Sequence, residues 1–263
     1  MAFSSRWPTA LVTGASSGIG RSFAIALARR GCDVVVVARR TDRLEELASE
    51  IRASSGRAVE VMVADLTDAG ALRSVEARLA DRDRPVDLLV NNAGFGGSGP
   101  FTDQPVDHEE AEIRLNVLAP VRLSAAALPG MIERRRGGIV NVSSIAGVQA
   151  VPFLATYAAT KAYLNSFSQA LHEEVRRDGV TVVALLPGMT RTEFHAVAGL
   201  DRSMVPGPAW LSSDEVAEAG LRALEKGRAL AVPRLGYRFF AGLSRATPLA
   251  VNRRIAALVG RQL

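Results

Sequence analysis

Short hydrophobic runs alternate with longer segments in which apolar residues recur at helical spacing, from residue 10 to about residue 232. The short runs are rich in valine, isoleucine and leucine. Runs of this kind indicate strands that are buried on both faces, as in a parallel sheet covered by helices. The strands predicted in this way are Ala10–Thr13, Val34–Ala38, Val59–Ala64, Val86–Val90, Ile139–Val142 and Val180–Leu185.

Amphipathic helices are predicted between these strands. One covers Arg21–Arg30 and ends at Gly31, and another runs from about Arg43 to Arg52. Before the second helix, Asp42 followed three residues later by Glu45 matches a capping box. The alternation of strands and helices predicts an α/β fold, a doubly wound (Rossmann) parallel sheet of about seven strands with right-handed crossovers.

The last third of the chain departs from this alternation. Residues 189–211 contain several Gly and Pro and follow the end of a strand, where loops over ligands tend to lie. A helix is expected to begin after Ser212 or Ser213 and to lead to a seventh strand, Ala229–Val232. We therefore predict one domain over residues 1–233, including the loop 189–211, and a basic amphipathic extension over residues 234–263.

The composition is that of a soluble globular protein. Hydrophobic residues make up 48% and charged residues 22% of the 263 positions. The single cysteine, Cys32, excludes an internal disulfide and suits a reducing compartment. No uncharged apolar run reaches the roughly 18 residues needed to span a bilayer, and the N-terminus shows no cleavage signal. We therefore expect a cytoplasmic protein.

The positive charge is concentrated at the C-terminal end. Residues 227–263 contain seven arginines and no acidic residue, so this segment carries +7, the whole chain +5 and residues 1–226 the difference of −2. The body offers no basic stripe with aromatic platforms, so no nucleic-acid partner is expected. Apolar residues of the extension recur between the arginines at helical spacing. Two interpretations stay open, namely contact with an anionic membrane or packing on the body or on another subunit.

A glycine-rich turn follows the first predicted strand. Thr13–Gly20 reads TGASSGIG, with glycines at G-x-x-x-G-x-G spacing, and a helix is predicted to begin at once. Such glycines let the backbone turn sharply and let a diphosphate approach the helix N-terminus. A tight turn without a ligand is the alternative. Gly14–Gly18 also matches the nucleophile elbow of α/β-hydrolases, but that motif should follow several strands and precede an acid and a histidine.

Two arginines follow the second predicted strand. Arg39 and Arg40 occupy the position where an NAD-specific enzyme places an acidic residue against the ribose 2′-hydroxyl. Guanidinium groups there favour a 2′-phosphate through charge-assisted bidentate hydrogen bonds. The pair predicts NADP(H), whereas two solvated arginines in an arginine-rich chain are the alternative.

The sharpest motif is Y-x-x-x-K at Tyr157 and Lys161. A spacing of four residues puts both side chains on one face of a helix, and chance gives such a pair only about 0.02 times in this chain. A nearby cation and a bound nicotinamide would lower the pKa of the phenol, so that it exchanges a proton near neutral pH. Thirteen residues earlier, Ser144 ends a predicted strand, where its hydroxyl can donate to a substrate oxygen. Ser143 is the less favoured serine.

In combination, these motifs resemble those of the short-chain dehydrogenase/reductase family over about residues 8–232. The resemblance implies a catalytic tetrad in which Tyr157 is the acid/base, Ser144 stabilises the oxyanion and Lys161 orients the ribose. Asn116 would complete this tetrad by holding a water that links Lys161 to solvent. No metal ion is expected.

The resemblance also implies where the cofactor binds. The glycine-rich turn would hold the diphosphate and ribose, Asp65 the adenine amine, Asn91–Gly94 the adenosine ribose, and Pro187, Gly188 and Thr192 the carboxamide. Besides Tyr157 and Lys161, the predicted cofactor-binding residues are Gly14, Ser16, Ser17, Gly18, Ile19, Gly20, Arg39, Arg40, Asp65, Leu66, Asn92, Ala93, Gly94, Pro187, Gly188 and Thr192.

The predicted function is the NADP(H)-dependent interconversion of a carbonyl and an alcohol by hydride transfer, with a ketone or aldehyde that has a sizeable apolar part. The expected pocket walls are Phe95–Phe101, Ile145–Phe153 and Met189–Trp210. A catalytically silent dinucleotide-binding regulator of the same fold is the alternative. The family suggests a homodimer or homotetramer, but the extension after Pro233 is longer and more basic than in many relatives, so the family's C-terminal packing is not carried over.

Overall fold

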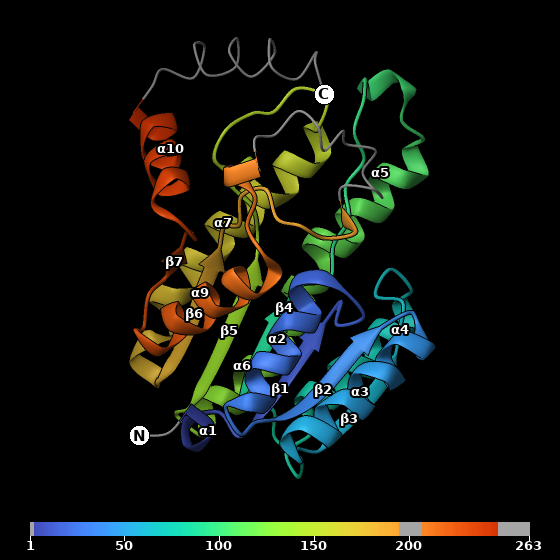
Figure 1. Ribbon diagram of the computed structural model, residues 1–263, viewed down its shortest axis with the longest axis vertical. Coiled ribbons are helices and arrows are strands. Elements are labelled where there is room, and N and C mark those ends of the chain that lie inside the picture. Colours follow the sequence, from blue (N-terminus) through green and yellow to red (C-terminus); the bar gives the residue numbers. More distant parts are fainter. Residues whose placement is uncertain (1–2, 195–206, 247–263) are drawn as a thin grey trace.

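Seven parallel strands form one sheet in the order β3-β2-β1-β4-β5-β6-β7 (Figure 1). The computed structural model describes residues 3–194 and 207–246. The strand order reverses between β1 and β4, which is where open α/β sheets bind ligands. The seven predicted strands are confirmed, with ends that differ by at most two residues: β1 Thr9–Thr13, β2 Asp33–Ala38, β3 Val59–Val63, β4 Leu88–Asn91, β5 Gly137–Val142, β6 Val180–Leu185 and β7 Leu230–Ala231.

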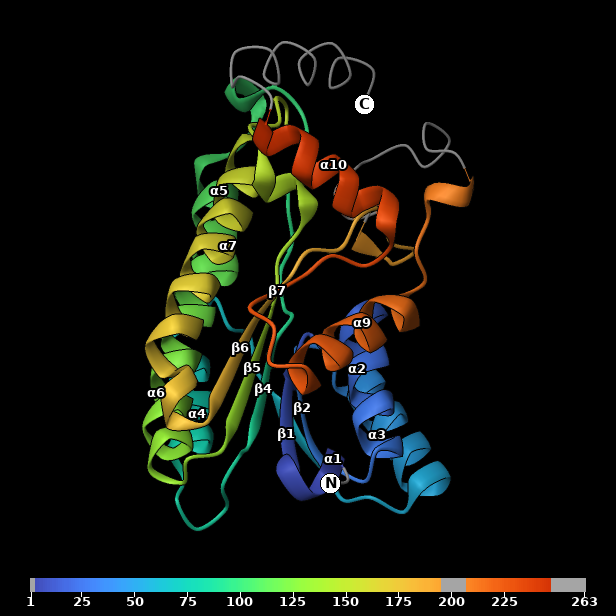
Figure 2. The ribbon, with the colours of Figure 1, turned by 90° about the vertical axis from the view of Figure 1, so that its left-hand side faces the viewer.

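Helices cover both faces of this sheet (Figure 2). One face carries α2 (Gly18–Arg29), α3 (Thr41–Ser55) and α9 (Ser213–Glu225), and the other carries α4 (Ala69–Ala80), α6 (Ala119–Glu133) and α7 (Ala155–Val175). Each layer buries its apolar stripe on the sheet, with Phe23, Leu44 and Leu221 in the first core and Leu72, Leu123 and Met131 in the second. Burial of each of these side chains contributes about 1.5–3 kcal/mol to folding.

The capping box predicted for α3 is wrong. α3 already begins at Thr41, so Asp42 lies inside its first turn, and the side chain of the N-cap residue Arg40 makes no capping bond. A capping box lies instead at α9, where Glu215 N–H donates to Ser212 Oγ at 3.1 Å and Ser212 N–H donates to Glu215 Oε2 at 2.8 Å. The prediction that a helix begins after Ser212 is therefore confirmed.

A continuous helix of 28 residues runs along the second helical layer. It comprises α5 (Val106–Ile113), the π-helical segment η2 (Arg114–Leu118) and α6. Its length and apolar composition would allow it to cross a membrane, but 44% of its most apolar stretch of 18 residues is buried inside the domain. A wide turn such as η2 is often found at functional sites, and here it carries Asn116.

The described part of the C-terminal extension is α10 (Leu235–Ala246), which begins beside the loop that follows β6. The Tyr237 hydroxyl donates to Ala209 C=O at 2.7 Å and accepts from Met189 N–H at 3.1 Å. A Cβ on Gly188 would lie 2.2 Å from the Tyr237 ring, so the ring packs directly on that glycine. α10 therefore holds both ends of the loop, whereas residues 195–206 and 247–263 lie outside the described residues.

Candidate active site

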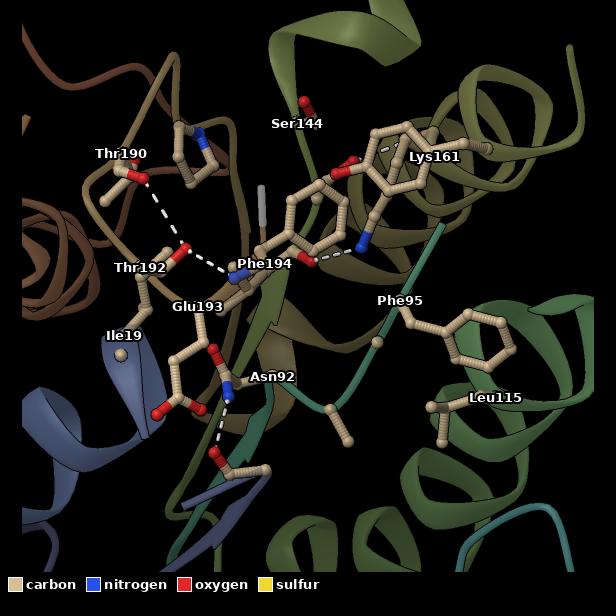
Figure 3. Close-up of a pocket in the computed structure, with 18 of the residues that line it drawn as sticks. Ile19, Asn92, Phe95, Leu115, Ser144, Lys161, Thr190, Thr192, Glu193 and Phe194 are labelled. Atoms are coloured by element: carbon tan, nitrogen blue, oxygen red, sulfur yellow. Dashed lines mark hydrogen bonds between the residues drawn. The ribbon is translucent and has the colours of Figure 1, made fainter. Parts of the chain in front are cut away.

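A cavity of about 670 Å³ lies over the carboxyl ends of the strands. It extends from the first turn of α2 to α7 and the loop after β6 (Figure 3). It is lined by every site residue predicted from the sequence except Gly20, Asn116 and Asn91, and the buried Asn91 amide donates to Asn141 Oδ1 instead. The motifs, which are scattered between Gly14 and Thr192 in the sequence, are therefore brought together in one place.

The glycine-rich turn has no room for side chains. Gly14 and Gly18 have φ values of +64° and +53°, which favour glycine. A Cβ on Gly14 would lie 2.7 Å from the Asn92 amide, and a Cβ on Gly20 would lie 2.3 Å from the Gly14 carbonyl oxygen. Gly20 therefore serves the packing of α2 on the turn, while Gly18 and Ile19 line the cavity. The N-terminus of α2 presents backbone N–H groups there, as an anion site requires.

A hydrogen-bond network fixes this turn to the end of β4. Asn92 Nδ2 donates to Thr13 C=O at 2.9 Å. The Thr13 hydroxyl accepts from the N–H groups of Asn92 and Ala93 at 3.0 and 3.1 Å. The Thr13 side chain is buried, so its role here is to hold Asn92, Ala93 and the turn in one arrangement. This role of Thr13 was not predicted from the sequence.

Both predicted arginines lie at the rim of the cavity. Arg39 Nη1 is 3.6 Å from Asp65 Oδ2 and its side chain is 74% exposed. Arg40 Nη2 donates to Ser16 Oγ at 3.1 Å and to Glu193 Oε2 at 3.0 Å, and this bond holds the pKa of the Glu193 carboxyl below its usual value. Exposed pairs of this kind contribute at most about 1 kcal/mol, so a phosphate group can compete with them for the guanidinium groups.

Tyr157 and Lys161 lie side by side on α7, where Lys161 is buried and Tyr157 is half-buried. Lys161 Nζ is 5.6 Å from the centroid of the Tyr157 ring and donates to Val142 C=O at 3.0 Å. Burial raises the pKa of Tyr157 to about 12, although a hydrogen bond with Ser144 acts in the opposite direction. Burial lowers the pKa of Lys161 to about 8. The expected lowering of the phenol's pKa involves a bound nicotinamide as well as Lys161, and it stays a prediction.

The two adjacent serines have different surroundings. The Ser143 hydroxyl donates to Lys161 C=O at 2.9 Å, so it ties β5 to α7. Ser144 caps the short helix η3 (Ile145–Val148) by accepting from Ala146 N–H at 3.0 Å, and it also forms the hydrogen bond with Tyr157. These contacts agree with the preference for Ser144 as the serine that faces a substrate.

Asn116 lies behind the cavity wall. Its Nδ2 donates to Phe95 C=O at 2.8 Å and to the Thr160 hydroxyl at 3.2 Å, and its Oδ1 accepts from Phe95 N–H at 3.2 Å. A Cβ on Gly94 would lie 2.8 Å from this Oδ1 and 3.5 Å from Lys161 Nζ, so both polar groups border Gly94. Asn116 thus holds the segment after β4, and a water-holding role stays a prediction.

The walls of the cavity differ from the sequence-based expectation in detail. Phe95, Ile145, Val151 and Met189 line it as expected, but Phe101 and Phe153 border a separate small cavity. Sequence reasoning missed Leu115 of η2, and it did not single out Glu193 or Phe194, whose ring lies 5.3 Å from that of Tyr157. Leu115 could have been suspected from its place beside Asn116, whereas nothing local in the sequence marks the loop residues.

The fold and the cavity define a class of protein. A parallel sheet with this strand order, with a glycine-rich turn after the first strand and a cavity at the reversal of strand order, is the doubly wound dinucleotide-binding fold. Residues 8–202 match the family model of short chain dehydrogenase. The chain belongs to this family.

Individual relatives agree with this assignment. The structure of a short-chain dehydrogenase from Sphingobium yanoikuyae in complex with NADPH is 41% identical, with a TM-score of 0.83 and coverage of 89% of this chain and 91% of that chain. A bulky-bulky ketone specific alcohol dehydrogenase from Comamonas testosteroni is 35% identical, with a TM-score of 0.81 and 92% coverage of both chains. The very-long-chain 3-oxoacyl-CoA reductase of Bos taurus is 38% identical over 72% of this chain, but the chain spans only 61% of that relative.

Proposed function

We propose that this chain is an NADP(H)-dependent oxidoreductase that reduces a ketone or aldehyde with a large apolar part, or oxidises the matching alcohol. The observation that carries the proposal is the continuity of one cavity. It joins the glycine-rich turn and the arginine rim at one end to Ser144, Tyr157 and Lys161 at the other. The cavity volume of about 670 Å³ suits a binding site for small molecules.

The residues at one end fit a phosphorylated dinucleotide. The missing Cβ atoms of Gly14 and Gly18 leave the turn open to a diphosphate, and the N-terminus of α2 favours its negative charge. Arg39 and Arg40 offer bidentate donors for a 2′-phosphate, and Asp65 lies beside them on the rim. The NADPH bound to the Sphingobium relative supports the same choice of cofactor here. When bound, NADPH supplies the hydride that reduces the carbonyl carbon.

The residues at the other end fit the proton chemistry. Tyr157 donates its phenolic proton to the carbonyl oxygen during reduction, and Ser144 donates a hydrogen bond to the same oxygen as charge develops on it. Lys161 uses one of its three donors on Val142 C=O. The other donors are left to orient ribose hydroxyls and to favour the tyrosinate that forms after proton transfer. The high pKa of Tyr157 is consistent with its acting as the acid of a reduction.

The substrate end of the cavity is apolar. Phe95, Val151, Leu154 and Phe194 line it, whereas the charged lining residues other than Lys161 all lie at the rim, namely Arg39, Arg40, Asp65 and Glu193. The described lining thus offers no second basic group for an acidic substrate. The bulky ketones named for the Comamonas relative and the 3-oxoacyl chain named for the bovine relative support a large apolar substituent.

An NADPH-oxidation screen tests the proposal. The panel contains diaryl ketones, long-chain 3-oxoacyl thioesters and small aldehydes, and Tyr157→Phe serves as the inactive control. We expect turnover of the bulky ketones or of the thioesters, with little turnover by the control. NADPH binding measured by fluorescence without turnover of any panel member would favour the silent regulator. Absence of NADPH binding would overturn both the reductase and the silent regulator.

A further inference from the structure

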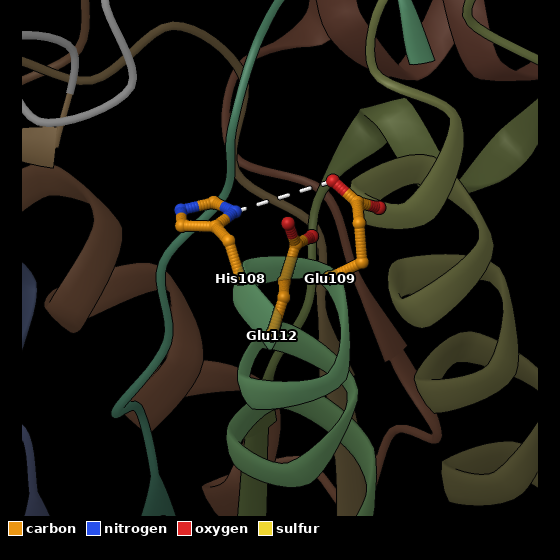
Figure 4. Close-up of side chains that lie close together, drawn as sticks. All are labelled: His108, Glu109 and Glu112. Carbon is orange, nitrogen blue, oxygen red and sulfur yellow. Dashed lines mark ion pairs between the residues drawn. The ribbon is translucent and has the colours of Figure 1, made fainter. Parts of the chain in front are cut away.

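Three side chains with metal-ligating atoms converge on one side of α5, outside the large cavity (Figure 4). One nitrogen of His108 and one carboxylate oxygen each of Glu109 and Glu112 lie within 4.8 Å of one another. His108 and Glu112 are four residues apart, which is the spacing at which two side chains of a helix can bind one zinc ion. No metal ligand was predicted from the sequence, because none of these residues belongs to the family motifs.

Each of the three side chains turns one coordinating atom toward the cluster. In the two glutamates, the other carboxylate oxygen accepts a hydrogen bond from the protein. Glu112 Oε2 accepts from Gly97 N–H at 3.2 Å, and Glu109 Oε2 accepts from the Thr156 hydroxyl. The remaining atoms are Glu112 Oε1 and His108 Nδ1, which are buried and have no hydrogen-bond partner among the described residues, and Glu109 Oε1, which lies 4.0 Å from that Nδ1. Each side chain therefore presents one atom to the same small space.

The surrounding backbone fixes this arrangement. A Cβ on Gly97 would lie 2.9 Å from His108 Cε1, so glycine at this position lets the imidazole approach. The Phe95 ring packs edge-on against the imidazole, with centroids 5.1 Å apart. Outer contacts of this kind, together with those of Gly97 and Thr156, orient metal ligands in known sites.

The two carboxylates of the cluster favour a bound cation. Glu112 is only 1% exposed. One of its carboxylate oxygens lies within 4.8 Å of one of Glu109, so two acidic groups share the same small space. Two carboxylates this close repel each other, and a divalent ion bound between them would relieve that repulsion.

We propose that His108, Glu109 and Glu112 bind one divalent transition-metal ion, for which zinc is the best match. One imidazole nitrogen and two carboxylate oxygens form a ligand set that zinc prefers, whereas magnesium prefers oxygen ligands only. Zinc requires bonds of about 2.0–2.2 Å, so the three side chains rotate to bring their free atoms closer than they are in Figure 4.

A fourth ligand position can be filled by water. A cavity of about 30 Å³ borders the cluster and is lined by Glu109, Glu112, Gln104 and Tyr157, among others. This volume is about that of one water molecule. Tyr157 borders both this small cavity and the large one, and the proposed ion is independent of which carbonyl compound the large cavity accepts.

Zinc binding to untagged protein, freed of metal by a chelator, tests the inference by calorimetry and thermal melting. We expect one equivalent of zinc to bind with a Kd in the micromolar range or tighter and to raise the Tm. Glu112→Gln and His108→Ala are each expected to weaken binding by about 10–100-fold. Glu110→Gln is the matched control, because Glu110 lies on the same helix, is exposed and pairs with Arg114.

Three outcomes would overturn the inference. They are the absence of zinc binding at one equivalent, wild-type affinity in both ligand variants, and magnesium producing the same rise in Tm as zinc. If Glu112→Gln does not fold, His108→Ala decides alone, because the His108 side chain is 39% exposed and its removal leaves the core intact. None of these readouts depends on turnover, so the inference and the proposed reductase function can fail separately.

Discussion

Lys161 is expected to lower the stability of the folded protein, so its replacement by an apolar residue should stabilise the chain near neutral pH. Its pKa falls from 10.5 in a free side chain to about 8 because burial disfavours the charged form. At 1.36 kcal/mol for each pKa unit, the charged side chain destabilises the fold by about 3 kcal/mol at pH 7. Lys161→Met removes this effect but loses the hydrogen bond to Val142, which costs about 1 kcal/mol. The net gain is about 2 kcal/mol.

The sign of this effect depends on pH. Below about pH 8 the lysine is protonated in both the folded and the unfolded chain, and the destabilisation is complete. Between about pH 8 and pH 10.5 the folded chain binds fewer protons than the unfolded chain, so the stability contributed by this group rises with pH. Above that range only the lost hydrogen bond remains, and the wild type should be the more stable protein by about 1 kcal/mol.

Urea unfolding of both proteins without added cofactor, from pH 7 to above pH 10, measures the difference directly. A gain of about 2 kcal/mol corresponds to a rise in Tm of about 4–8 °C for a domain of this size. The other lysine, Lys226, is exposed, and Lys226→Met should change stability by less than about 0.5 kcal/mol. A difference between wild type and Lys161→Met that does not vary with pH would refute the reasoning.

The remaining predictions concern activity. Tyr157→Phe should lower kcat by at least about 10²-fold while NADPH still binds, and near-normal turnover would mean that another group is the acid. Arg39→Asp should reverse or abolish a preference for NADPH over NADH, because a carboxylate repels a 2′-phosphate; the check is kcat/KM with both cofactors, and a wild type without preference would contradict the assignment. Tyr237→Phe keeps the ring but loses the bonds to Met189 and Ala209, so KM for the carbonyl substrate should rise about 5-fold while the Kd for NADPH stays the same.

The sheet and most of the candidate site could be predicted because both depend on short stretches of sequence. A strand buried on both faces appears as a short apolar run whatever its neighbours are, as in β1, β2, β4, β5 and β6, and the partly exposed edge strands β3 and β7 also contain enough apolar residues to be found. The glycine-rich turn, the two arginines and the Tyr157–Lys161 pair are likewise contiguous motifs, and the parallel topology brings their strand ends to one edge.

The parts that were missed depend on contacts between distant segments. Thr13 was read only as part of a motif, but its role lies in bonds to residues about 80 positions away. Glu112 has no local signal, because its burial comes from the packing of α5 in the domain, and this burial raises the pKa of its carboxyl although the Gly97 N–H acts in the opposite direction. The prediction of a capping box at Asp42 failed for a related reason. The local sequence allows the helix to begin at more than one residue, and only the fold selects between them.

The bonds of Tyr237 give the C-terminal extension a consequence for regulation. Because Tyr237 holds Met189 and Ala209, whatever restrains α10 also restrains the loop beside the active site. Thermodynamic linkage is reciprocal. If a membrane or a second subunit binds the extension and thereby changes the affinity for substrate, then bound substrate changes the affinity for that membrane or subunit by the same factor. Removal of residues 247–263 keeps Tyr237 and the rest of α10 in the chain, whereas a cut before Tyr237 would remove the bonds to Met189 and Ala209 as well.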